Sequence, residues 1–103
     1  MPTYEVLQGF LRDYKRLTEA EKALFLQAVN HFVRDLKAGR FRKGLRVKKI
    51  QGHEGVWEMT WAPDGRATFE YGTEQRAGEP HVVWRRIGAH EILGDPRRSY
   101  QIE

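Results

Sequence analysis

The sequence predicts an α+β fold in which an N-terminal helical hairpin packs on a small, mainly antiparallel, twisted β-sheet. Apolar residues recur at helical spacing through residues 7–36. From Gly44 onward the period changes towards two, in a stretch rich in Val, Ile, Trp, Thr and Tyr. Helices followed by strands are typical of the α+β class.

The first helix is predicted from one apolar face, whose residues lie three and four apart: Leu7, Phe10, Leu11, Tyr14 and Leu17. The residues before it are ambiguous, because Tyr4 and Val6 alternate as in a strand and also extend the helical stripe. A second helix begins at Thr18, which forms a capping box with Glu21, and ends at Gly39. Together the two helices form the predicted hairpin.

A β-hairpin is predicted around residues 62–65, where Pro63 suits a type I turn and Gly65 suits the left-handed residue of a bulge. A third strand is expected over residues 81–87, after a polar loop at residues 72–80. The strands then form a short antiparallel sheet.

This turn predicts a register in which cross-strand residue numbers sum to 128, so that apolar residues face each other in three pairs: Trp57 with Tyr71, Met59 with Phe69, and Trp61 with Ala67. On the opposite face Glu58 lies opposite Glu70. Arg66 shares that face with either Arg85 or Arg86, depending on the register of the third strand. Such a face is either an ordinary Glu/Arg lattice or a site with a general base beside phosphate-binding arginines.

Length and composition predict a single domain over residues 1–103, with an ordered core at about residues 3–93 and a tail at 94–103. The absence of cysteine excludes disulfides and thiolate metal sites. The start of the chain has no signal-peptide pattern, and no apolar run approaches ~18 residues, so we expect a cytoplasmic protein with no membrane contact. No metal-ligand spacing is diagnostic, and we expect neither a metal nor a cofactor.

The charge is concentrated in residues 34–49, which hold 8 of the 18 Lys and Arg residues but only one acid, Asp35. The eight are Arg34, Lys37, Arg40, Arg42, Lys43, Arg46, Lys48 and Lys49. This density suits phosphate binding, although a solvated helix end has the same composition. Among the histidines, His90 follows the arginine-bearing strand at a point where it can face the polar side of the sheet, and its ordinary pKa suits proton transfer.

Two amphipathic helices followed by four segments together resemble the RelE/ParE toxin superfamily. The segments are the basic linker FRKGLRVKKI at residues 41–50, the hairpin strands GVWEMTW and GRATFEY, and the last strand VVWRRIGAH. The overlap covers about residues 3–93. The more specific elements are the linker-to-strand passage K-K-I-x-G…G-V-W-E, the arginine after the turn, Arg66, and the I-G-x-H ending at His90. The chain departs from the family at Glu58 and Thr60, where lysines are frequent.

The resemblance implies a RelE-like fold, similar to microbial RNases, and the toxin of a toxin–antitoxin pair. RelE-like members cleave mRNA on the ribosome without a metal, by activating a ribose 2′-OH against the adjacent phosphate. The expected partners are therefore a cognate antitoxin, the ribosome and mRNA. The alternative is a non-catalytic member, either a gyrase-inhibiting toxin or a module that only binds nucleic acid or a partner.

On this basis we expect a catalytic set of Arg66, His90, Glu58 and Arg85. Arg66 and Arg85 bind phosphate, and His90 and Glu58 are the acid/base candidates. The expected RNA-binding residues are Arg42, Lys43, Arg46, Lys48, Lys49 and Arg86. An antitoxin segment with acidic residues is expected to cover this basic surface.

Overall fold

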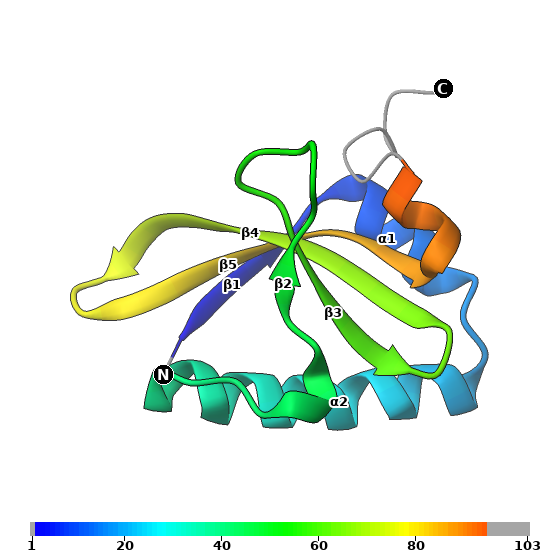
Figure 1. Cartoon of the computed structure of the whole chain (residues 1–103), viewed down its shortest axis with the longest axis horizontal. Helices are drawn as coiled ribbons and strands as arrows, with labels where there is room; N and C mark the ends of the chain where they lie inside the picture. The colour runs from blue at the N-terminus through cyan, green and yellow to red at the C-terminus, as the bar shows by residue number, and fades with distance from the viewer. Residues whose placement is uncertain (1, 95–103) are drawn as a thin grey trace.

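The computed structural model describes residues 2–94 as two helices and one five-stranded sheet (Figure 1). The elements in chain order are β1 (Thr3–Val6), α1 (Gln8–Lys15), α2 (Glu19–Ala38), the short 3-10 helix η1 (Lys43–Leu45), β2 (Lys48–Lys49), β3 (Trp57–Ala62), β4 (Gly65–Arg76), β5 (Glu79–Ala89) and the 3-10 helix η2 (His90–Gly94). The strand order is β1-β5-β4-β3-β2. The α+β class is therefore confirmed. All but Gly94 of the predicted tail lies outside the described residues.

The sheet is mixed, because β1 runs parallel to β5 while all other neighbours are antiparallel. The ambiguous start of the chain is a strand, in which Tyr4 pairs with Val82 and Val6 with Trp84. The antiparallel sheet is thus confirmed in part. Neither helix in residues 2–94 is long and apolar enough to cross a bilayer.

Both predicted ends of α2 are confirmed. The Thr18 hydroxyl accepts from the Glu21 amide at 3.1 Å, and the Glu21 carboxylate accepts from the Thr18 amide at 2.8 Å. At the other end Gly39 has φ +83°, and its N–H reaches the Leu36 carbonyl at 3.2 Å. Local sequence signals thus define this helix completely.

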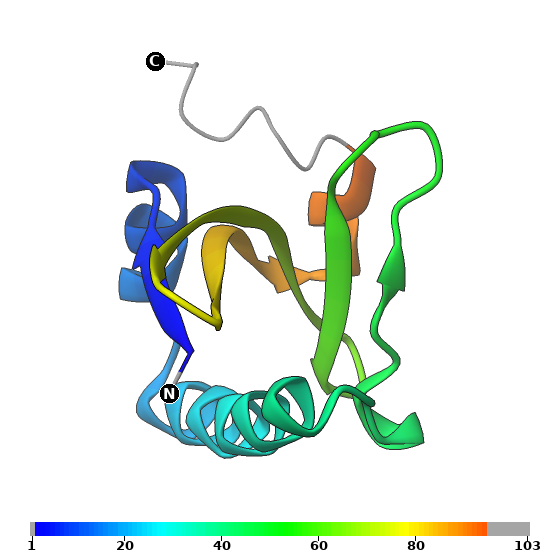
Figure 2. The ribbon, with the colours of Figure 1, turned by 90° about the vertical axis from the view of Figure 1, so that its left-hand side faces the viewer.

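The helical hairpin is confirmed only in part, because the two helices lie against different parts of the sheet. Helix α2 runs along one face of the sheet, whereas α1 lies apart from α2 and contacts β5 (Figures 1 and 2). They meet through aromatic rings: the centroids of Phe10 and Phe25 are 5.8 Å apart, and those of Tyr14 and Phe25 are 6.3 Å apart. The contact between α1 and α2 is therefore made by aromatic side chains of the core.

The core lies between α2 and the sheet and is rich in aromatic residues. Phe32 of α2 is 1% exposed, and its ring is 5.1 Å from Phe69 and 5.3 Å from Trp84. Met59 and Phe69 are fully buried. The predicted apolar sheet face is confirmed for Met59, Trp61, Ala67 and Phe69, which are buried, whereas Tyr71 is 42% exposed. The opposite face is left for polar residues.

The predicted register of the β3–β4 hairpin is wrong by two residues. Met59 pairs with Ala67 and Glu58 with Thr68, so Glu58 does not face Glu70. The cause is a two-residue loop of Pro63 and Asp64, with an irregularity at Trp61. A shift of two preserves which side chains share a face, and the predicted faces therefore survive.

Gly65 is required for a different reason from the one predicted. It lies in β4 and does not adopt a positive φ. A Cβ at this position would lie 2.6 Å from Cε2 of the Trp61 ring, closer than any carbon contact allows. The glycine therefore makes room for a tryptophan that packs on the turn.

Strands β4 and β5 are longer than predicted, because residues 72–80 form most of a hairpin rather than a loop. The turn lies at Ala77 and Gly78, and Gly78 has φ +81°. A bulge interrupts β5, since Thr68 pairs with Arg86 but Phe69 pairs with Trp84, which leaves Arg85 as the extra residue.

Candidate active site

An exposed histidine–carboxylate pair lies where the β3–β4 turn meets η2. Nδ1 of His90 is 2.7 Å from Oδ1 of Asp64, and the two side chains are 70% and 68% exposed. The hydrogen bond with His90 holds the pKa of Asp64 below its usual value, while partial desolvation opposes it. Because the carboxylate occupies Nδ1, Nε2 is the ring nitrogen left for a substrate.

Asp64 is the residue that sequence reasoning missed, because it was read only as part of a turn. The strand pairing could have indicated it. Because β4 pairs with both β3 and β5, the β3–β4 turn that carries Asp64 lies beside the C-terminal end of β5. Gly65 pairs with Ala89 in the structure, which brings the residues adjacent to each of them together.

Arg66 lies beside this pair, with its guanidinium folded back over the turn. Nη1 donates to the Gly65 carbonyl at 3.0 Å and lies 3.4 Å from the Pro63 carbonyl. Nε is 3.8 Å from Oε1 of Glu58. The side chain of Arg66 is 18% exposed and that of Glu58 is 9% exposed. Glu58 therefore lies beneath the arginine rather than on an open surface.

Of the four predicted catalytic residues, the structure brings Arg66 within 3.8 Å of Glu58, whereas His90 is linked to Arg66 only through Asp64, which binds His90 and feels the charge of Arg66. Arg66 also lowers the pKa of Asp64 through its charge. The group thus offers an exposed proton carrier, an oriented carboxylate and a guanidinium fixed by several acceptors. This combination can exchange a proton and stabilise a developing negative charge.

Arg85, the fourth, lies further along the sheet and forms an ion pair with Glu70 of β4. Its side chain is 12% exposed. Arg86 takes a different direction because of the bulge, and donates from Nε to Oδ2 of Asp13 in α1 at 2.9 Å. The alternative between Arg85 and Arg86 is thus resolved: Arg85 lies on the polar face of the sheet with Glu70, and Arg86 binds Asp13 of α1.

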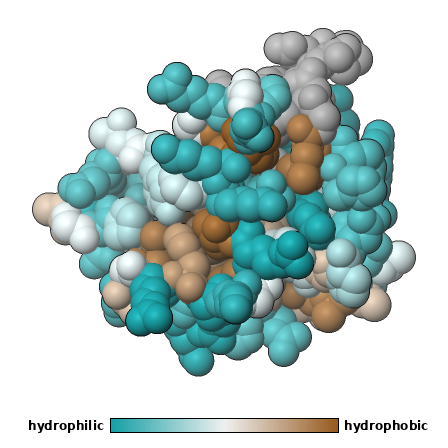
Figure 3. Space-filling view, in the orientation of Figure 1, coloured by the Kyte–Doolittle hydropathy of each residue, from teal (hydrophilic) through white to brown (hydrophobic). Residues whose placement is uncertain are grey.

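The basic residues occupy η1, β2 and the linker before them. Lys48 pairs in register with Glu58, which places β2 directly beside the candidate site. Lys49 lies 5.6 Å from the Trp57 ring. Arg46 is exposed and has φ +48°, a backbone conformation that non-glycine residues rarely adopt. In Figure 3 hydrophilic side chains cover most of this face, with apolar atoms visible between them.

Arg42 is already engaged by α2. Its backbone N–H, Nε and Nη2 donate to the carboxylate of Asp35 at 2.9, 2.8 and 2.8 Å, and Nη1 lies 2.7 Å from Nδ1 of His31. The side-chain and backbone hydrogen bonds from Arg42 lower the pKa of Asp35 from 3.8 to about 2. This fork holds the basic linker against the end of the helix.

We expect this interaction to make stability acid-sensitive. Above about pH 5 Asp35 is ionised in both states, so its contribution to stability is complete. As the pH falls from about 5 towards 2, the unfolded chain takes up a proton first and the free energy of unfolding decreases. Thermal unfolding between about pH 2 and 5 should show a smaller acid-induced decrease for Asp35→Asn than for the wild type. Parallel curves for the two proteins would contradict this origin.

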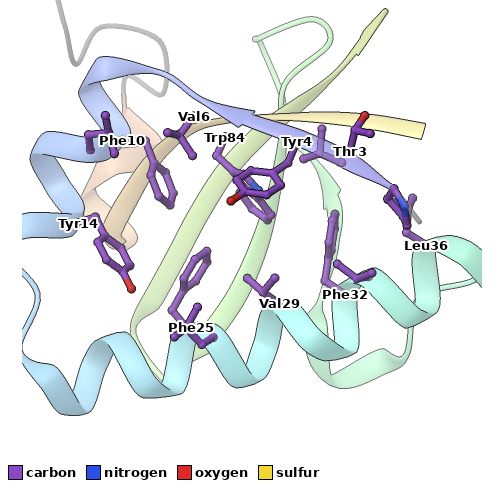
Figure 4. Close-up of a pocket in the computed structure, with 15 residues that line it drawn as sticks. Thr3, Tyr4, Val6, Phe10, Tyr14, Phe25, Val29, Phe32, Leu36 and Trp84 are labelled. Atoms are coloured by element: carbon purple, nitrogen blue, oxygen red, sulfur yellow. The ribbon is translucent and has the colours of Figure 1, made fainter. Parts of the chain in front are cut away.

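A separate apolar cavity of about 380 Å³ lies between α2 and the β1–α1 segment (Figure 4). Phe25, Val29 and Phe32 approach it from α2, and Tyr4 and Phe10 from the other side. It contains none of the predicted site residues. Among residues 2–94, no three His, Asp or Glu side chains gather in a way that could hold a metal ion.

No protein-family model matches the sequence, and no curated protein is detectably similar to it. Solved structures, in contrast, match over most of both chains. They include the RelB–RelE antitoxin–toxin complex from Methanococcus jannaschii, at 13% identity and a TM-score of 0.60 over 87% of this chain and 94% of that chain. The YoeB/ParE toxin from Agrobacterium tumefaciens matches at 13% identity and a TM-score of 0.63, over 85% and 98% of the two chains. The Escherichia coli DinJ–YafQ toxin–antitoxin complex matches at 13% identity and a TM-score of 0.60, over 89% and 96%.

The chain therefore has the fold of the RelE, YoeB and YafQ toxins, as the resemblance in its sequence predicted. At these identities the comparison establishes the fold, and the function must be argued from the site.

Proposed function

We propose that this protein is the toxin of a toxin–antitoxin pair and that it cleaves mRNA on the ribosome by metal-free attack of a ribose 2′-OH on the adjacent phosphate. The observation that carries the proposal is the exposed His90, held at 2.7 Å by Asp64, a carboxylate that also feels the charge of Arg66. The shared fold with toxins of such pairs supports it.

The reaction needs a base that takes the 2′-OH proton, a cation for the charged phosphorane, and an acid that protonates the leaving 5′-oxygen. His90 supplies the proton carrier at Nε2: the neutral ring takes the proton of the 2′-OH, and the resulting imidazolium gives that proton to the leaving 5′-oxygen. Its bond to Asp64 keeps the ring oriented. Arg66 supplies the cation. The breaking bond joins phosphorus to the 5′-oxygen, and the new bond closes a 2′,3′-cyclic phosphate.

The other acid/base candidate, Glu58, is buried beneath Arg66 and fixes that guanidinium in place. Arg85, tied to Glu70, adds a second cation for a phosphate further along the strand. Arg86 can bind an RNA phosphate only when its ion pair with Asp13 is broken. Substitution of His90 or Arg66 is therefore the main test of the proposed mechanism.

Lys43, Arg46, Lys48 and Lys49 provide the approach for the RNA backbone, since all four are exposed on the side that carries β2. Phosphate binding by such residues depends steeply on salt. The proposed antitoxin covers the same surface with acidic residues, and the proposed place of action is the cytoplasm.

The test is induced expression in a growing bacterium, with mRNA ends mapped before and after induction. We expect growth to stop and new ends to appear within translated regions for the wild type, but not for His90→Gln. A toxic protein that leaves mRNA intact would favour the non-catalytic alternative, such as gyrase inhibition. A protein that expresses at high yield without slowing growth would contradict the toxin proposal itself.

A further inference from the structure

A second cavity, of about 470 Å³, lies on the α2 side of the β3–β4 hairpin. It is bounded by α2, η1 and the turn that also carries Asp64. Its lining contains Arg42, Arg46, Arg66 and His31, and no Asp or Glu among the residues that the structure describes. Outside the lining, Asp35 pairs with Arg42 and Glu58 lies 3.8 Å from Arg66. The lining itself still carries more positive than negative charge because of Arg46, and it therefore favours an anionic ligand.

Apart from Gln27 and Thr60, the remaining walls are mostly apolar and suit a flat ring. Leu24 of α2 is 45% exposed here, and Trp61 and Pro63 of the hairpin lie on the other side. The indole Nε1 of Trp61 is buried and has no hydrogen-bond partner within residues 2–94.

Two of the cationic side chains are already positioned, since Arg42 is held by Asp35 and His31, and Arg66 by the carbonyls of the turn. Arg46 follows η1 and is exposed. Arg66 lines this cavity and also contacts Glu58 in the candidate active site. One guanidinium therefore links the two sites across the β3–β4 turn.

We propose that this cavity binds one nucleotide of an RNA strand whose neighbouring nucleotides occupy the candidate active site. Its unpaired base lies against Leu24, Trp61 and Pro63, and its phosphate lies among the three arginines. The inference rests on the proposed cleavage of RNA and adds to it a subsite on the other side of the hairpin. The mixture of apolar walls and guanidinium groups favours a nucleotide over an acidic peptide, which needs no ring-shaped apolar surface.

Two variants of α2 separate this subsite from general electrostatics. Gln27 lines the cavity and is exposed, so Gln27→Glu places a carboxylate there without disturbing the helix. Asn30 is exposed on the same helix but does not line the cavity, so Asn30→Glu is the matched control for net charge. The probe is a single-stranded RNA of about six nucleotides with 2′-O-methyl ribose throughout, which binds but offers no attacking hydroxyl.

We expect Gln27→Glu to weaken binding of this probe by about fivefold or more, and Asn30→Glu by less than about twofold, in fluorescence anisotropy at fixed salt. An acidic peptide of equal charge should bind at least about tenfold more weakly than the RNA. Equal losses in the two variants, tighter binding of the peptide, or no binding of the probe to the wild type would each overturn the subsite. If the wild type cleaves mRNA but the two variants lose probe binding equally, the subsite alone is refuted. If Gln27→Glu selectively loses probe binding but the wild type cleaves no mRNA, the enzymatic proposal is refuted and the subsite stands.

Discussion

Replacing Arg66 by alanine should lower mRNA cleavage by about 10²–10³-fold while the protein remains folded. The guanidinium is fixed by Glu58 and by the carbonyls of the turn before any substrate binds. A charge fixed in this way stabilises a phosphorane without reorganisation during the reaction. Toxicity on induction and cleavage of ribosome-bound mRNA measure the loss, and far-UV circular dichroism checks the fold.

The matched control is Arg34→Ala, which removes an equal charge from an exposed position on α2 outside both candidate sites. Its cleavage rate should stay within about twofold of the wild type. The competing interpretation is that Arg66 only neutralises Glu58 in a structural lattice. It would be supported if Arg66→Ala lowered the melting temperature but left the activity per folded molecule unchanged.

Replacing Asp13 by alanine should cost about 2–4 kcal/mol of unfolding free energy. Its carboxylate accepts from Nε and Nη2 of Arg86 at 2.9 and 3.2 Å, and from the Ile87 amide at 3.1 Å. The residue is 9% exposed, so its loss leaves a largely buried guanidinium and a backbone N–H without an acceptor. For a domain of this size the melting temperature should fall by roughly 10 °C or more.

Glu19→Ala is the control for this substitution, because it breaks an exposed ion pair with Lys22 in which the Glu19 side chain is 94% exposed. Its cost should stay below about 1 kcal/mol. Similar losses for the two variants, measured by urea unfolding, would show that Asp13 does not hold α1 to β5.

The parts of the fold that were predictable are those set by local chemistry. Thr18, Glu21 and Gly39 define the ends of α2 through bonds within a few residues of each other. The apolar sheet face was predictable because alternation does not depend on the exact register. The parallel pairing of β1 with β5 was not, since it joins residues about as far apart as the chain allows.

The errors in the hairpin have a physical origin in packing. Sequence rules place a glycine after Pro-Asp in a left-handed conformation, yet Gly65 serves the Trp61 ring that packs upon it. The loop is one residue shorter than predicted, and an irregularity at Trp61 interrupts the pairing; together these shift the register by two residues. The polar loop expected at residues 72–80 is a hairpin for a related reason: polar residues can pair as strands where both faces meet water.

The candidate site was predictable in its residues but not in its arrangement. Arg66 and His90 were predicted from the sequence. Asp64 was not, because its role depends on the tertiary contact between the β3–β4 turn and η2. The bulge at Arg85 sends two adjacent arginines to different partners, Glu70 and Asp13. No alternation rule anticipates such a bulge, because it is set by tertiary contacts.

The chemistry of the cleaved ends tests the central claim most directly. Attack by the 2′-OH expels the 5′-oxygen, so cleaved mRNA must carry a 2′,3′-cyclic phosphate, or the 3′-phosphate formed from it, and a 5′-hydroxyl. The measurement is labelling of mRNA fragments from induced cells with polynucleotide kinase, before and after phosphatase treatment. The account predicts 5′-hydroxyl ends that label without phosphatase and that disappear in His90→Gln, whereas fragments with 5′-phosphate ends would contradict it.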